Sequence, residues 1–220
     1  MIDAVVFDMD GVLIETESVY KETFKQILSK YGAVYCEEFF LHLTGTTLEK
    51  DGATKIIERF NLPVSEKQLI EEIYETFDEI SSKLKPREGV LETIKTLKEL
   101  KKHVALATST VKDRALQRLE RCGLTDFFDV TVFGDEVINS KPDPQIYLKA
   151  LERLKTEGSR VVVFEDSVNG IKSAIGAGIS SVLGVLHDYN DPESLIKAGA
   201  VCADEPPQVF FFFLEKLLQL

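Results

Sequence analysis

The segment Phe7-Asp8-Met9-Asp10-Gly11-Val12-Leu13 directly follows a short apolar run, residues 4–7, and this junction indicates the fold. The run is predicted to be a buried strand of a parallel sheet, because such strands are continuously apolar and rich in β-branched residues. Asp8 and Asp10 leave the strand on the same side, since side chains alternate with a period of two. Their carboxylates repel each other unless a cation or a shared proton lies between them.

Further along the chain, short apolar runs alternate with helical patterns. The predicted strands are residues 104–107, 130–133, 161–164, 181–185 and 200–202. The predicted helices are residues 88–100, 111–121, 144–154 and 168–177, followed by a last helix around 210–213 that packs its aromatic side chains on the sheet. This alternation predicts an α/β fold with a doubly wound, mostly parallel sheet.

Residues 15–83 interrupt the alternation. They hold helical periodicity at 18–31, 47–60 and 65–83, and Ser65 and Gln68 have the spacing of a capping box. We therefore predict an α/β core made of residues 1–14 and 84–220, with an all-helical cap domain, residues 15–83, inserted after the first strand. Ligands of open α/β sheets bind beyond the carboxyl ends of the strands, so a cap inserted at this edge can act as a lid.

Polar clusters follow three more of the predicted strands. Thr108-Ser109-Thr110 stands at a helix start, where free N–H groups attract anions. Lys141, in Ser140-Lys141-Pro142-Asp143-Pro144, adds positive charge at another helix start. Glu165-Asp166-Ser167 offers hard oxygen ligands that suit Mg²⁺. Each cluster alone also fits ordinary capping or a solvated surface. Together they gather at one edge of one sheet, where packing does not require them, and they indicate a functional site.

These four ordered motifs closely resemble those of the haloacid dehalogenase-like phosphatase superfamily. The match is to the branch with a small helical cap after the first strand, which includes β-phosphoglucomutase-like proteins, and it spans essentially the whole chain. The resemblance implies that Asp8 is the nucleophile and forms an aspartyl-phosphate. It implies that Asp10 protonates the leaving oxygen and then activates water.

The resemblance also implies the ligands of the phosphoryl group and of the cofactor. The phosphoryl oxygens would be held by Thr108, Ser109 and Lys141. The cofactor would be Mg²⁺, bound by the Asp8 carboxylate, the Asp10 backbone carbonyl and Asp166, with Glu165 nearby. Such chemistry depends mainly on positioning and on neutralising charge, which a metal ion and a lysine supply in this acidic chain.

The cap loop departs from the β-phosphoglucomutase pattern. Those enzymes hold a second phosphate with a lysine and an arginine, whereas Thr44 and Leu48 stand at these places here, and Lys50 is displaced by two positions. A mutase must bind a bisphosphate, so losing a charged clamp favours a phosphatase of a phosphorylated sugar or a similar monophosphate. A phosphosugar mutase is the alternative. Substrate choice is expected to depend on residues that the cap brings to the leaving group: Thr44, Glu49, Lys50 and Tyr20.

Composition restricts the partners. The net charge is −11 and no basic stripe is present, so a nucleic acid would be repelled. No apolar run approaches the roughly 20 residues of a membrane helix, and the first residues resemble a strand rather than a signal peptide. Cys36, Cys122 and Cys202 are widely spaced, as in a reduced cytoplasmic protein. We expect a cytoplasmic monomer that acts on a small phosphorylated metabolite.

Two further classes of protein could use some of the same residues. A receiver-like signalling module would hold a phosphorylated Asp8 without fast turnover, but Asp10 supplies a base for dephosphorylation. A dehalogenase would need neither Asp10 nor the metal-binding acids.

Overall fold

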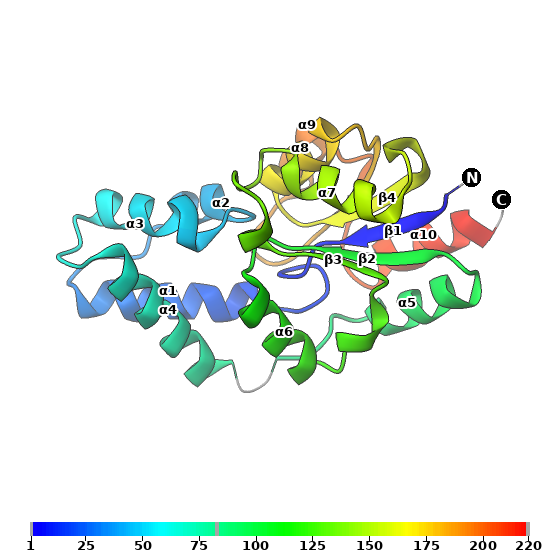
Figure 1. The fold of residues 1–220 in the computed structure, drawn as a ribbon. Helices are drawn as coiled ribbons and strands as arrows, with labels where there is room; N and C mark the ends of the chain where they lie inside the picture. Colours follow the sequence, from blue (N-terminus) through cyan, green and yellow to red (C-terminus); the bar gives the residue numbers. More distant parts are fainter. Residues whose placement is uncertain (1, 82–83, 219–220) are drawn as a thin grey trace.

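The computed structural model describes residues 2–81 and 84–218, and its centre is a six-stranded parallel sheet (Figure 1). The strands are β1 (Ala4–Phe7), β2 (His103–Ala107), β3 (Val130–Val132), β4 (Val161–Glu165), β5 (Ser181–Val185) and β6 (Cys202–Asp204). Their order in the sheet is β3-β2-β1-β4-β5-β6. The direction of winding therefore reverses between β1 and β4, which is where open α/β sheets bind ligands.

Helices cover both faces of the sheet. One face carries α5 (Val90–Glu99), α6 (Lys112–Arg121) and α10 (Gln208–Leu218), and the other carries α7 (Gln145–Leu154), α8 (Val168–Gly176) and α9 (Pro192–Ala198). Side chains of β1 alternate between the two resulting cores, with Val5 and Phe7 in one and Ala4 and Val6 in the other. The predicted doubly wound α/β fold is thus confirmed.

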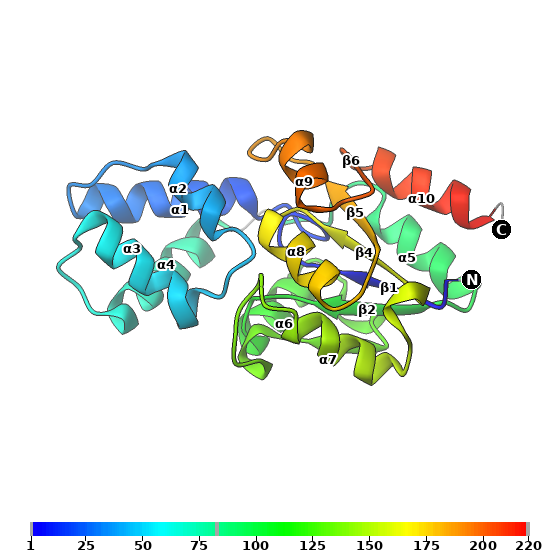
Figure 2. The same cartoon turned by 90° about the horizontal axis from the view of Figure 1, so that it is seen from above.

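Between β1 and α5 the chain forms a separate group of helices, which we call the helical lobe. It consists of α1 (Glu17–Lys30), α2 (Glu37–Leu43), the π-helical turn η1 (Leu48–Gly52), α3 (Ala53–Phe60) and α4 (Glu66–Ile80). The lobe has an apolar cluster of its own, centred on Ile27, Phe40, Ile56 and Ile73. It lies beyond the edge of the sheet toward which the strands point (Figure 2).

The helices differ from the prediction in a few places. The helix expected at 47–60 is divided into η1 and α3, and β6 begins two residues later than expected. Ser65 and Gln68 do form a capping box at the start of α4, although residues 82 and 83 of the expected helix lie outside the described residues. The short helices α2 and α9 were not predicted. For α9, Asp191 at the cap and Pro192 in the first turn are the signals that could have located it.

Three short 3₁₀ turns complete the core: η2 (Thr125–Phe127), η3 (Gly134–Glu136) and η4 (Gly158–Arg160). None of the helices within residues 2–81 and 84–218 has the length and apolar character needed to cross a membrane.

Candidate active site

Lys141 is the centre of the charge network at the β1–β4 junction. Its ammonium group lies 2.6 Å from Asp8 Oδ1, 2.5 Å from Glu165 Oε1 and 3.2 Å from the carbonyl oxygen of Ala107. The lysine side chain is fully buried. Burial alone would lower the pKa of Lys141, but the two carboxylates outweigh it and raise that pKa above its ordinary value. All three N–H donors of the ammonium have acceptors, so a contact with a phosphoryl oxygen requires one of these bonds to be exchanged.

Three buried carboxylates meet beside this lysine. Asp8, Glu165 and Asp166 each offer an oxygen, and these oxygens lie within 4.8 Å of one another. Burial and the repulsion between these acids raise the pKa of Asp8 and of Asp166 well above the usual range, although Lys141 opposes the effect. Positive charge is therefore in deficit at this point of the structure.

The deficit of positive charge is centred on Asp166. Its Oδ2 atom is buried without a hydrogen-bond partner. His187 Nε2 lies 3.3 Å away, but its geometry forms no hydrogen bond, and burial lowers the pKa of His187, so the ring brings no positive charge at neutral pH. A cluster of hard carboxylate oxygens with one orphaned atom and a deficit of positive charge fits Mg²⁺.

Glu165 is held by donors of the core. Its Oε1 accepts from Lys141 and from Tyr147 Oη at 2.7 Å, while Oε2 accepts from the Ser167 hydroxyl at 3.1 Å. The position of Glu165 depends on Gly170, because a Cβ atom at Gly170 would lie 1.9 Å from Oε1. Glu165 thus orients Lys141, and its oxygens have less capacity for a metal ion than those of Asp166.

Asp10 is held at both carboxylate oxygens. Thr110 Oγ1 donates to Oδ2 at 2.6 Å, and the Arg118 guanidinium donates to Oδ1 at 2.7 Å. Gly11, which follows, has φ of +77°, and a Cβ atom there would lie 2.0 Å from Asp166 Oδ2. Only glycine therefore allows the chain after Asp10 to pass this close to the carboxylate cluster.

Arg118 was missed by the sequence analysis. It is 3% exposed, it donates to Tyr20 Oη at 2.8 Å, and its guanidinium carbon lies 4.2 Å from the ring centre of Phe77. A core residue on α6 therefore joins Asp10 to two helices of the lobe, α1 and α4. The available signal was its place next to Leu119 on the apolar face of a predicted helix, where an arginine needs a partner.

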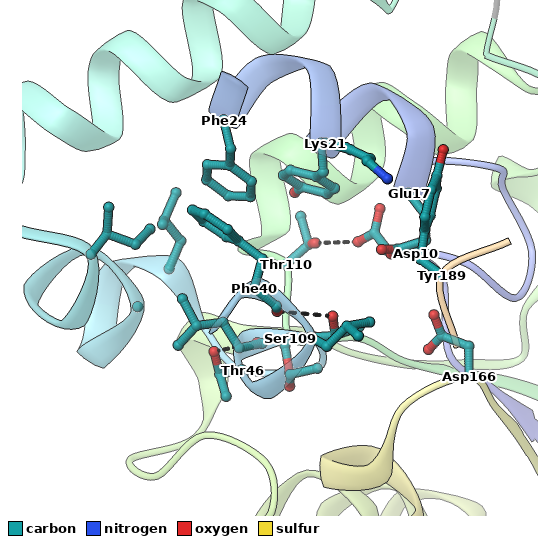
Figure 3. Close-up of a pocket in the computed structure, with 18 of the residues that line it drawn as sticks. Asp10, Glu17, Lys21, Phe24, Phe40, Thr46, Ser109, Thr110, Asp166 and Tyr189 are labelled. Atoms are coloured by element: carbon teal, nitrogen blue, oxygen red, sulfur yellow. Dashed lines mark hydrogen bonds between the residues drawn. The ribbon is translucent and has the colours of Figure 1, made fainter. Parts of the chain in front are cut away.

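The two predicted hydroxyl ligands have different surroundings. Thr108 is buried at the end of β2 and lines the pocket next to Asp8. Ser109 also lines the pocket, but its hydroxyl donates to the carbonyl oxygen of Gly45 in the lobe at 2.6 Å (Figure 3). On the opposite side, Asn169 donates to the Thr44 carbonyl oxygen at 2.9 Å. The loop after α2 is therefore attached to the core at two points.

A single pocket extends from this edge into the lobe. Its core side contains Asp8, Asp10, Thr108, Ser109, Thr110 and Asp166. Its lobe side combines aromatic and aliphatic residues with four charged ones: Phe24, Tyr35, Phe40, Leu43, Leu48, Ile56, Glu17, Lys21, Glu37 and Glu49. The side chains labelled in Figure 3 converge on this space from α1, from α2 and the loop after it, and from the segments that follow the strands.

The residues predicted to choose the substrate are placed unequally. Tyr20, Thr44 and Glu49 line the pocket. Lys50 does not, because its ammonium group donates to the carbonyl oxygen of Val137 in the core. The expectation that Lys50 faces the leaving group is therefore corrected. Within the part of the chain that the structure describes, the lysine that lines the pocket is Lys21, which the sequence analysis did not select.

Known proteins share both this sequence and this fold. A family model described as haloacid dehalogenase-like hydrolase matches residues 5–184. The chain belongs to this family. The hydrolase is 40% identical over 216 residues to the "Phosphorylated carbohydrates phosphatase" of Thermotoga maritima, covering 98% of this chain and 100% of that one.

Solved structures agree with this assignment. A β-phosphoglucomutase-like protein from Thermotoga maritima superposes on the hydrolase with a TM-score of 0.78 and 40% identity, covering 97% and 99% of the two chains. CbbY from Rhodobacter sphaeroides, in complex with phosphate, has a TM-score of 0.78 at 28% identity and covers 93% of this chain and 94% of its own.

Proposed function

We propose that this hydrolase is a Mg²⁺-dependent phosphatase that hydrolyses a small phosphorylated metabolite, a sugar phosphate, through an aspartyl-phosphate on Asp8. One observation carries the proposal: Asp8 lies at the floor of the pocket, paired with the buried Lys141 and adjacent to the orphaned oxygen of Asp166. The name of the Thermotoga maritima relative supports a phosphorylated carbohydrate as the substrate.

In the first half of the reaction, a carboxylate oxygen of Asp8 attacks the phosphorus. A bond forms between that oxygen and phosphorus, and the bond to the leaving oxygen breaks. Asp10 gives its proton to the leaving oxygen, a contribution typically worth about 10²- to 10⁴-fold in rate. Thr110 and Arg118 hold the Asp10 carboxylate in place for this transfer.

In the second half, the roles of Asp10 are reversed. Its carboxylate takes a proton from a water molecule, the water oxygen bonds to phosphorus, and the bond between phosphorus and Asp8 breaks. Phosphate is released and the enzyme returns to its original state. Lys141 holds Asp8 throughout, and Thr108, which lines the pocket, would donate to a phosphoryl oxygen. Mg²⁺ held by Asp8, Asp166 and the Asp10 carbonyl would supply neutralisation of the phosphoryl charge.

The lobe would serve as the predicted cap. It supplies the wall around the leaving group and joins the core through Arg118, Ser109 and Asn169. Such a cover excludes water other than the one that reacts.

Mutase activity is the weaker alternative. It needs a cationic clamp for a second phosphate, but Lys50 lies outside the pocket and the lining Lys21 already pairs with Glu37. Water is therefore favoured over a sugar hydroxyl as the final acceptor.

The proposal is tested by replacing the nucleophile. With Mg²⁺ and p-nitrophenyl phosphate, the wild-type enzyme should release phosphate, whereas Asp8→Asn should not, because an amide cannot accept the phosphoryl group. Asp126→Asn, at an exposed carboxylate in η2, is the matched control and should keep full activity. Turnover by the Asp8→Asn variant would overturn the assignment. Assaying conversion of β-glucose 1-phosphate to glucose 6-phosphate, with a bisphosphate primer, separates phosphatase from mutase.

A further inference from the structure

The lobe side of the pocket carries an excess of negative charge. Among the described residues that line it, three acids, Glu17, Glu37 and Glu49, stand with a single cation, Lys21. The buried cations Lys141 and Arg118 belong to the sheet edge, where Asp8 and Asp10 already bind them. The leaving group of a substrate therefore enters a region of net negative charge.

The charge of Lys21 is already neutralised. Its ammonium group donates to both carboxylate oxygens of Glu37, at 2.9 and 2.8 Å. It also lies 4.0 Å from the ring centre of Tyr189, and Figure 3 shows these two side chains next to each other. An anionic group on the substrate could bind Lys21 only by displacing Glu37. The Glu37 side chain is 45% exposed and therefore hydrated, so an anion that displaced it would still meet this carboxylate nearby.

The remaining lobe surface offers little to an anion. Phe24 and Phe40 stack with ring centres 4.3 Å apart, and Leu43 and Ile56 extend this apolar wall. The Tyr74 hydroxyl, a donor at the edge, is bound to Glu49. Apolar walls with a few acceptors suit the C–H faces and hydroxyl donors of an uncharged ring.

We propose that the enzyme selects phosphomonoesters whose leaving group is uncharged or positively charged, and that Glu37 enforces this selection by neutralising Lys21. The inference rests on the phosphatase function proposed above. Polyol, sugar and amino-sugar monophosphates belong to the accepted class. Bisphosphates and phosphorylated sugar acids are rejected, because their second anion meets acids and, among the lining residues that the structure describes, no free cation.

Three substrates that differ chiefly in the charge of the leaving group test this selection. Glucose 6-phosphate, glucosamine 6-phosphate and 6-phosphogluconate are phosphorylated at the same carbon. Glycerol 3-phosphate and 3-phosphoglycerate form a second, shorter set. With Mg²⁺ in excess over all phosphates, kcat/KM should be roughly 30-fold lower for 6-phosphogluconate than for glucose 6-phosphate, and for 3-phosphoglycerate than for glycerol 3-phosphate, as expected for like charges brought together. Glucosamine 6-phosphate should react at least as well as glucose 6-phosphate.

Variants of the ion pair identify its role. Glu37→Gln should raise kcat/KM for 6-phosphogluconate relative to glucose 6-phosphate by about tenfold, because Lys21 becomes free to bind the carboxylate. Adding Lys21→Met to Glu37→Gln should remove this gain. The matched control is Glu38→Gln, which removes the neighbouring exposed acid of α2 outside the pocket lining and should leave the ratio unchanged. The ratio compares two substrates of one variant, so partial misfolding does not alter it.

The outcomes separate this inference from the phosphatase function. If the wild-type enzyme hydrolyses sugar or glycerol phosphates but treats the acid members equally well, the charge selection is wrong and the phosphatase function stands. If Glu37→Gln leaves the ratio unchanged, or if the double variant keeps the gain, the role of Glu37 and Lys21 is wrong. If no phosphomonoester at all is hydrolysed, the proposed function itself fails.

Discussion

Lys141 binds Asp8 behind the core side of the pocket, and Lys21 lines its lobe side; both lysines pair with carboxylates, but they differ in their surroundings. Lys141, at the sheet edge, is fully buried and binds Asp8 and Glu165. Lys21, in the lobe, is 21% exposed and binds Glu37, which is 45% exposed. A buried pair cannot rearrange without leaving a charge unsolvated, whereas an exposed pair can exchange its partner at little cost.

This contrast separates two tasks. The charges at the sheet edge are fixed. This suits a reaction in which the phosphorus, the nucleophile and the proton donor must be placed accurately. The lobe holds charges that substitution or a ligand can rearrange, which is suited to choosing the leaving group. We expect changes at the sheet edge to alter the chemical step whatever the charge of the leaving group, and changes in the lobe to alter the choice between charged and uncharged leaving groups.

The largest effect is expected at Asp10. Asp10→Asn cannot transfer a proton, so kcat/KM for an alkyl phosphate should fall by about 10²- to 10⁴-fold. The fall should be much smaller for p-nitrophenyl phosphate, whose leaving group needs no proton. Steady-state kinetics with both substrates measures the difference. An equal loss for both would show that Asp10 acts through structure rather than as an acid.

Replacing the two lysines tests the contrast directly. Lys141→Met leaves buried carboxylates without their partner and should lower the free energy of unfolding by about 3 to 5 kcal/mol. Lys21→Met should lower it by less than about 1 kcal/mol, because the ion pair is partly exposed. Urea denaturation of both variants gives the two values. Similar losses would mean that burial does not distinguish the two sides of the pocket.

Arg118 joins the two sides, and its removal should have an intermediate effect. Arg118→Met should reduce kcat/KM for alkyl phosphates by roughly 10- to 100-fold, because Asp10 loses one of the two donors that orient it. Aryl phosphates should be affected less if Arg118 acts through Asp10. Tyr20→Phe removes only the bond from Arg118 to the lobe and should alter KM more than kcat. An equal loss with alkyl and aryl phosphates after Arg118→Met would contradict the positioning role.

A small effect that depends on pH is expected at Glu17, at the border between lobe and core. Burial and the nearby Asp166 raise the pKa of Glu17 to about 7. Between about pH 4.5 and pH 7 the folded protein binds this proton more tightly than the unfolded chain, so the stability that this group contributes is lost as the pH rises. Glu17→Gln should therefore stabilise the metal-free protein by about 1 to 2 kcal/mol at pH 8, since Glu17 is not fully buried and solvent screens part of the effect.

Urea unfolding at pH 5 and pH 8 in the presence of a chelator measures the effect at Glu17. The variant should gain stability at pH 8 and little at pH 5. Glu22→Gln, at an exposed acid of the same helix, is the control and should change neither value. A gain of equal size at both pH values would show that Glu17 does not titrate in this range.

The sheet-edge cluster could be predicted because local patterns determine it. Each apolar run identified a strand, and the polar residue after the run was placed at the carboxyl end. Parallel strands bring these ends to one edge, so Asp8, Thr108 and Asp166 were expected to meet before any contact was known. The lobe was predicted only as a set of helices, and its contribution to the pocket was assigned in part to Lys50, which points elsewhere.

The sequence by itself thus determined the classes of element, the position of the reactive edge and the residues that follow each strand. Only the tertiary structure decided that Arg118 binds Asp10 and Tyr20, that Ser109 binds Gly45, and that Lys21 replaces Lys50 in the pocket. The physical reason is the distance along the chain over which each kind of interaction acts. Periodicity and capping act over a few residues, whereas these contacts join residues far apart in the chain and depend on how the lobe packs against the sheet, which no local pattern encodes.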